Sequence, residues 1–161
     1  MTATTKITKI YDYILEKVKE AFPEHYELRD PEDITNNDTK FLVQGISILP
    51  GASENTEREI SCGRHWVRRD FEVIFTRELL GTVDNVENRH DVTKAILEDL
   101  NGLLQAVGVQ PSVFINSEQV AFDLRYVSDN GPRVIAANDL PFLFIEATFR
   151  VEYAETNTGG I

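Results

Sequence analysis

The side chains best able to do chemistry in this sequence are three histidines, one cysteine and a small group of arginines. Cys62 and His65 are separated by two residues, which is the spacing of half a tetrahedral zinc site. A closed site would also need His25, His90 or a carboxylate from a distant part of the chain. Because there is no second Cys/His pair, we interpret Cys62 and His65 as an ordinary surface thiol and imidazole and expect no bound metal.

Sequence signatures of catalysis and of cofactor binding are absent. The chain has no G-x-S-x-G nucleophile elbow, no G-x-x-x-x-G-K-[ST] phosphate loop, no G-x-G-x-x-G fingerprint and no H-E-x-x-H motif. Paired carboxylates such as Glu57/Glu59 and Glu98/Asp99 are expected on solvated faces, where nothing shifts their chemistry. We therefore expect no catalytic residue and no cofactor.

One basic cluster stands out in an otherwise acidic chain, and it consists of Arg58, Arg64, Arg68 and Arg69. In a strand, alternation places Arg64 and Arg68 on one face. Arg69 then falls on the other face, with Val67 and Phe71. Burying a guanidinium there without a carboxylate partner is expensive.

Two interpretations of this cluster stay open. The arginines can form exposed cross-strand ion pairs with acids such as Glu146 or Glu152, each worth a few tenths of a kcal/mol. Alternatively, they form a charged contact between subunits or with a neighbouring protein, which the position of Arg69 favours. The candidate interface then comprises Glu54, Glu57, Arg58, Glu59, Arg64, Arg68 and Arg69.

Length and charge limit the class of protein. A chain of 161 residues can bury a sizeable core without disulfides or a structural metal. With 16 basic and 27 acidic residues the formal charge is −11, which argues against binding to nucleic-acid phosphates. The first residues lack the apolar segment of a signal peptide, and no apolar run approaches the ~18 residues of a membrane span. We expect synthesis in the cytoplasm and neither nucleic acid nor membrane as a partner.

Apolar spacing of three and four residues predicts two amphipathic helices, at 5–22 and 84–107. Thr4 or Thr5 is the expected N-cap of the first helix. Gly108 is the expected C′ residue of the second helix.

Alternating apolar residues predict four strands, at 41–49, 65–77, 120–126 and 143–153. The second strand has a buried face with Phe71, Val73 and Phe75, and the last has Ile145, Phe149 and Val151. Polar, turn-rich composition predicts long loops at 24–40, 50–64 and 128–139.

The order of these elements is α-β-β-α-β-β. It predicts an α+β fold in one domain, residues 1–155, followed by a disordered tail at 156–161. The expected sheet is mainly antiparallel, has about four strands and carries both helices on one face.

The order of elements and three segments resemble the tail terminator proteins of long-tailed bacteriophages. The segments are HWVRRDFEVIFTREL, VTKAILEDLNGLLQAVG and the final strand LPFLFIEATFRVEYAE, and the resemblance extends from Ile7 to Glu155. It implies a short non-enzymatic protein that forms a ring, generally a hexamer, on the finished end of the tail tube. No catalytic residue is carried over.

The resemblance also implies partners and a location. The partners are the tail tube protein, a head-completion or connector protein and further copies of this chain, and the location is the head-proximal end of the tail in the virion. The acidic charge opposes self-association, so the isolated protein can be monomeric. A head-completion, neck or minor tail protein is the nearest alternative. A small acidic enzyme or ligand-binding domain is the alternative from another class, and a deep polar pocket with converging titratable groups would favour it.

Overall fold

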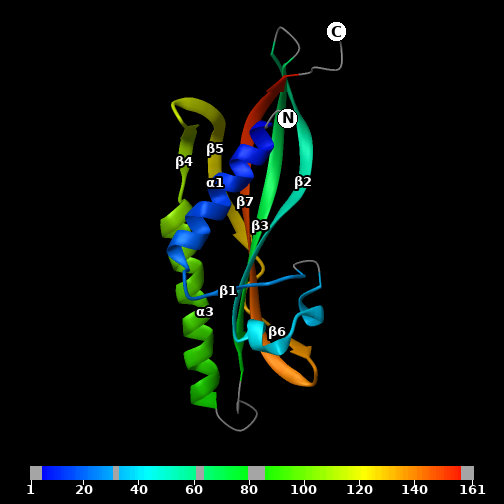
Figure 1. Ribbon diagram of the computed structural model, residues 1–161, viewed down its shortest axis with the longest axis vertical. Helices are drawn as coiled ribbons and strands as arrows, with labels where there is room; N and C mark the ends of the chain where they lie inside the picture. Colours follow the sequence, from blue (N-terminus) through cyan, green and yellow to red (C-terminus); the bar gives the residue numbers. More distant parts are fainter. Residues whose placement is uncertain (1–4, 31–32, 61–63, 80–85, 157–161) are drawn as a thin grey trace.

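Two long helices and a highly twisted sheet make up the protein in a computed structural model, which describes residues 5–30, 33–60, 64–79 and 86–156 (Figure 1). In chain order the elements are α1 (Lys6–Ala21), β1 (Tyr26–Glu27), the 3-10 helix η1 (Ile34–Asn36), α2 (Thr39–Leu42), β2 (Gln44–Ile60), β3 (Arg64–Glu78), α3 (Val86–Val107), β4 (Gln110–Ile115), β5 (Glu118–Asp129), β6 (Arg133–Ala137) and β7 (Leu140–Thr156).

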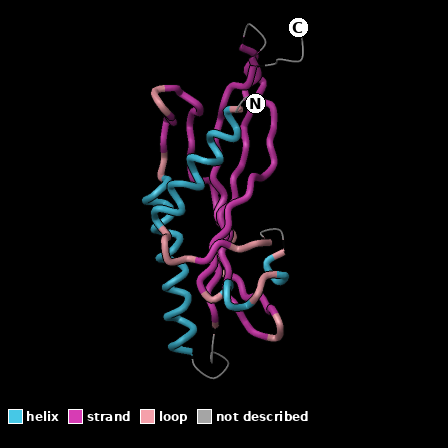
Figure 2. The backbone as a smooth tube through the Cα atoms, in the orientation of Figure 1, coloured by secondary structure: helices cyan, strands magenta, loops and turns pink. Residues whose placement is uncertain are grey.

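The sheet has the strand order β1-β2-β3-β7-β5-β4, and β6 pairs with the first part of β7. The short pair β1–β2 is parallel, and the other described pairs are antiparallel. β3 and β7 form the centre along their whole length, with Phe71 opposite Phe149 and Val73 opposite Ala147. Figure 2 shows these long strands twisting about one another through the middle of the molecule.

The two predicted helices are confirmed. The side chain of Thr5 caps α1 by accepting a hydrogen bond from the Thr8 backbone N–H, and Ile10, Ile14 and Val18 form its buried stripe. Gly108, after the end of α3, has a φ of +61°, a conformation that glycine adopts without steric cost.

The main core lies between the sheet and these two helices. Both α1 and α3 contact the central strands, and they also contact each other. The predicted buried face is confirmed, because seven apolar side chains of β3 and β7 beneath the helices are 0–3% exposed: Phe71, Val73, Phe75, Leu143, Ile145, Phe149 and Val151. A smaller cluster of Leu28, Leu42, Ala137 and Phe142 joins β1, α2, β6 and the start of β7.

The predicted loop at 50–64 is wrong over most of its length. β2 continues through Pro50 and Gly51 to Ile60 and pairs with β3 in a long hairpin. Register shifts between Pro50 and Ser53, and again between Asn55 and Glu59, absorb the residues that break the alternation. Because this hairpin extends the sheet with polar residues, it lacks the apolar pattern by which a strand is recognised.

The other two predicted loops also contain regular structure. The segment 24–40 holds β1, η1 and part of α2, and the segment 128–139 holds β6. A further strand, β4, was not predicted. The α+β class is therefore confirmed, but the described residues form a sheet of seven strands rather than about four, and they contain three α-helices rather than two. Thr156 belongs to β7, and the rest of the predicted tail lies outside the described residues.

Candidate interaction site on the open face of the sheet

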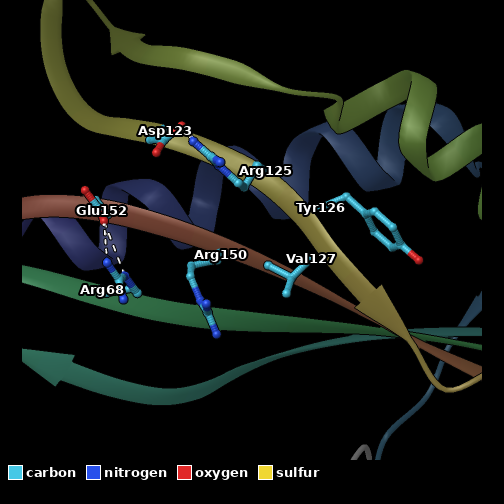
Figure 3. Close-up of a pocket in the computed structure, with 7 residues that line it drawn as sticks. All are labelled: Arg68, Asp123, Arg125, Tyr126, Val127, Arg150 and Glu152. Carbon is cyan, nitrogen blue, oxygen red and sulfur yellow. Dashed lines mark hydrogen bonds and ion pairs between the residues drawn. The ribbon is translucent and has the colours of Figure 1, made fainter.

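The side of β2, β3, β7 and β5 that faces away from α1 and α3 is called the open face here. Side chains alternate along a strand, so residues between the buried ones on β3 and β7 point to this side. Figure 3 views the open face with α1 behind the strands, and its charged side chains lie in front. The cross-strand pairs Arg68–Glu152 and Asp70–Arg150 occupy neighbouring positions there.

Arg68 joins three strands through its guanidinium group. Nη1 donates to Glu54 of β2 at 3.0 Å, and Nη2 and Nε donate to Oε1 of Glu152 of β7 at 3.1 and 3.3 Å. Hydrogen bonds to Glu152 and then to Glu54 raise the pKa of Arg68 above its already high ordinary value. One of the two interpretations from the sequence, a cross-strand ion pair between Arg68 and Glu152, is thereby confirmed.

Arg150 makes a second ion pair across the same two strands. Its Nε donates to Asp70 Oδ1 at 2.8 Å and its Nη2 to Asp70 Oδ2 at 3.4 Å. This two-pronged geometry fixes the plane of the guanidinium group more strictly than a single contact would. The hydrogen bond to Asp70 raises the pKa of Arg150, which therefore stays charged.

Arg125 lies on β5 and pairs with Asp123 within its own strand. Asp123 has a φ of +58°, an unusual conformation for a residue other than glycine, at a register shift between Phe122 and Arg125. The shift brings Arg125 directly opposite Arg150 of β7. Like charges at opposite positions of a strand pair are destabilising, so this arrangement has a local cost.

These side chains surround a hollow of about 300 Å³, called the arginine hollow here, that is lined by Arg68, Asp123, Arg125, Tyr126, Val127, Arg150 and Glu152 (Figure 3). Burial, followed by a hydrogen bond to Asp129, raises the pKa of Tyr126 to about 12, so its hydroxyl is protonated. The hollow therefore offers cationic donors and ion pairs.

Further along the open face the charge is acidic. Partial burial raises the pKa of Glu72, and the nearby carboxylates of Glu146 and then Asp70 raise it further. This face therefore changes from arginine-rich beside β5 to acidic at the middle of β3 and β7.

The structure brings together two of the seven predicted interface residues, Glu54 and Arg68. Arg69 lies on the opposite face and donates to the Tyr153 hydroxyl at 3.3 Å and to the Gly51 carbonyl at 3.2 Å. Its partners are thus neutral oxygen atoms rather than the expected carboxylate. The side chains of Glu57, Arg58, Glu59 and Arg64 lie outside the described part of the chain, as do Cys62 and the side chain of His65.

Four charged residues of this site were not predicted from the sequence: Asp70, Asp123, Arg125 and Arg150. Two of them could have been found from strand alternation. Asp70 lies two residues after Arg68, and Arg150 lies two residues before Glu152, so each shares a strand face with a residue that was named. No comparable signal exists for Arg125, because the register shift at Asp123 breaks the alternation on which such an inference depends.

A second polar cluster lies beneath the helices. Asp99 of α3 accepts two hydrogen bonds from Arg77 at 2.7 and 2.8 Å and contacts His25 Nε2 at 3.2 Å, and His25 Nδ1 contacts the Gln44 side chain at 3.2 Å. Burial alone would raise the pKa of Asp99, but the hydrogen bonds from His25 and Arg77 outweigh it and lower that pKa. Both ring nitrogens of His25 thus have partners within the fold.

Within the described residues no group of three or more His, Cys, Asp or Glu side chains is arranged to hold a metal ion. No helix in that same part of the chain is long and apolar enough to cross a bilayer.

Comparison with known proteins gives one informative result. No family model matches the sequence, and no curated protein sequence matches it. The fold is similar to that of a chain from the virion of a native gene transfer agent particle, with a TM-score of 0.50 and 9% sequence identity. The matched region covers 88% of this chain and 91% of the other, so the likeness is one of the whole fold.

Proposed function

We propose that this protein is a non-enzymatic structural component of a phage-type virion, in which it forms a ring on the head-proximal end of the tail tube. The ring stops growth of the tube and provides the surface on which the head-side connector docks. Its partners are the tube protein on one side, a head-completion or connector protein on the other, and further copies of itself around the ring.

The observation that carries this proposal is the whole-chain fold similarity to a virion component. The resemblance of three segments to tail terminator proteins is a separate line of support, because it rests on the sequence. The chemistry of the open face agrees with a binding role, since the arginine hollow holds ion pairs and no hydrogen-bonded nucleophile and base.

Termination follows from surface complementarity. One side of such a ring matches the last ring of tube subunits, and the other side does not repeat that surface, so no further tube subunit can add. Six copies at −11 each would carry a charge of −66, which repels rather than holds packaged DNA. The acidic stretch of the open face, with Glu72 and Glu146, is a candidate lining for such a bore.

The hairpin of β2 and β3 is the proposed contact region for the tube or for neighbouring subunits. It includes the predicted residues Glu54, Glu57, Arg58, Glu59, Arg64, Arg68 and Arg69. Exposed polar strands that extend a sheet can carry recognition without weakening the core.

A head-completion, neck or minor tail protein is the second candidate, because the same fold similarity would support it equally. A small enzyme or ligand-binding domain has less support. One hollow is lined by both His25 and Ser47, but the described hydrogen bonds of His25 go to Asp99 and Gln44 rather than to this serine.

Negative-stain microscopy of particles made with and without the protein tests the proposal. Without it, we expect tubes of irregular length and tails that lack heads, and resupplying the intact chain should restore uniform tails. Normal tails with separate filled heads would favour the neck protein. Normal virions lacking the protein altogether would exclude both assignments.

A further inference from the structure

The exposed side of α1 carries three carboxylates that the fold does not use. Asp12, Glu16 and Glu20 are spaced by four residues, so they lie in one row along the helix, called the acidic row here. All three are exposed, and none of them has an ion pair with any described side chain. Like charges at this spacing destabilise a helix.

The arginine hollow lies on the opposite side of the sheet, and its lining includes three arginines and two acids. Arg125 and Arg150 face each other across β5 and β7, each held by a carboxylate of its own, Asp123 and Asp70. Those bonds use Nε and Nη2 of each arginine, which leaves both Nη1 groups without an acceptor in the described part of the chain. The guanidinium groups are therefore oriented in advance and still have donors to offer.

The positions of these two features suit contact between copies. α1 lies behind the sheet in the view that shows the arginine hollow in front, so one copy presents the acidic row on its helix side and the hollow on its open side (Figure 3). A contact between two different surfaces of the same chain is head-to-tail, and head-to-tail contacts close into rings when the rotation between copies allows it.

We propose that neighbouring copies of this chain join through these surfaces, with Asp12, Glu16 and Glu20 of one copy docked on Arg125 and Arg150 of the next. This inference rests on the proposed ring, and it identifies the contact that would build it. A second copy is the occupant because the same chain supplies both the carboxylates of the acidic row and the unused Nη1 donors of Arg125 and Arg150. Each surface also places like charges next to each other in the isolated protein.

Net charge explains why this contact must be local. Two copies at −11 repel each other over long distances, and only matched charges at short range can offset that repulsion. The contact therefore forms most readily when a tube end holds several copies side by side.

Site-specific cross-linking in assembled tails tests the contact. In a Cys62→Ser background, Glu16→Cys and Arg125→Cys are combined in one chain, supplied to tails by complementation and treated with a short bismaleimide. A ladder of covalent multimers is expected on a denaturing gel. Chains with only one of the two cysteines, and the matched pair Lys94→Cys with Arg125→Cys, should give no ladder, since Lys94 is exposed on α3 and outside both surfaces.

A charge exchange keeps the proposal testable if the cysteine chains do not assemble. Arg125→Glu should prevent the protein from terminating the tail tube, and adding Glu16→Arg to the same chain should restore termination. The melting temperature should be unchanged in both variants. Rescue by the second reversal requires direct contact between the two positions in different copies. Tails that contain the normal amount of protein but give neither ladder nor rescue would overturn this contact and leave the proposed function standing. Normal tails without the protein would overturn the proposed function as well.

Discussion

Arg77 and Arg68 lie on the same strand and both bind carboxylates, but they lie on opposite faces of the sheet. Arg77 and Asp99 are under the helices, with side chains 22% and 7% exposed. Arg68 is on the open face, where its partners Glu54 and Glu152 are 63% and 17% exposed. The same chemistry therefore serves stability on one face, where an unpaired charge would be costly, and leaves the other face available for recognition.

The largest effect is expected from placing a charge on the covered face. Val73 lies on the side of β3 that faces the helices and is fully buried. Val73→Asp should therefore cost several kcal/mol against a total stability of about 5–15 kcal/mol, and yield unfolded or insoluble protein. Glu72→Gln is the matched control, because Glu72 is the next residue on the open face and should tolerate a neutral side chain with little change in thermal melting. A soluble Val73→Asp protein with native melting would show that the faces are assigned wrongly.

The second largest effect is expected at the buried pair. Asp99→Ala leaves Arg77 without its partner and should lower the free energy of unfolding by about 3–5 kcal/mol at pH 7. The pKa of Asp99 is lower in the folded state than in the unfolded state, where it is about 3.9. The contribution of Asp99 is thus fully present above that value and is lost as the pH falls through the folded pKa.

Urea unfolding of both proteins at pH 7 and near pH 3 measures this pH dependence. The difference between the native chain and Asp99→Ala should become smaller at the acidic pH. A difference that stays constant over this range would mean that the pair contributes through packing and not through charge.

A small effect on stability and a large effect on assembly are expected on the open face. Arg68→Glu places a carboxylate beside Glu54 and Glu152, but the position is partly exposed to solvent, so the change in stability should be small. Termination of the tail tube should nevertheless fail in a complementation assay, giving tubes of irregular length or tails without heads. Arg58→Glu, expressed separately, tests the far end of the hairpin, and Lys94→Glu on α3 is the control. Normal virions from both hairpin variants would remove this surface from the interface.

The smallest effect is expected at Cys62 and His65. The double variant Cys62→Ser/His65→Ala should fold and assemble like the native chain, since neither residue is assigned a metal or a nucleophilic role. Elemental analysis of the purified native protein should find no zinc. Stoichiometric zinc that disappears in Cys62→Ser would restore the metal site as an interpretation.

Residue periodicity was sufficient to predict the parts of the fold in which apolar residues are buried at a regular spacing. The stripe of Ile10, Ile14 and Val18 identified α1, and the alternation around Phe71 and Phe149 identified the central strands and their buried face. The pairing of Arg68 with Glu152 could also be predicted, because it requires only the alternation of side chains along the two strands. These features depend on local periodicity, which each segment carries in its own residues.

The strands and side-chain pairs that were not predicted depend on tertiary contacts. The hairpin beyond Pro50, the strands β1, β4 and β6, and the position of Arg125 opposite Arg150 all depend on pairing between segments that are polar, short or interrupted by register shifts. Asp99 was expected on a solvated face, yet it is buried with His25 through contacts with Arg77 and Gln44 from other elements. A polar residue carries no sign of its partner in its own segment, because the partner satisfies it only after the chain has folded.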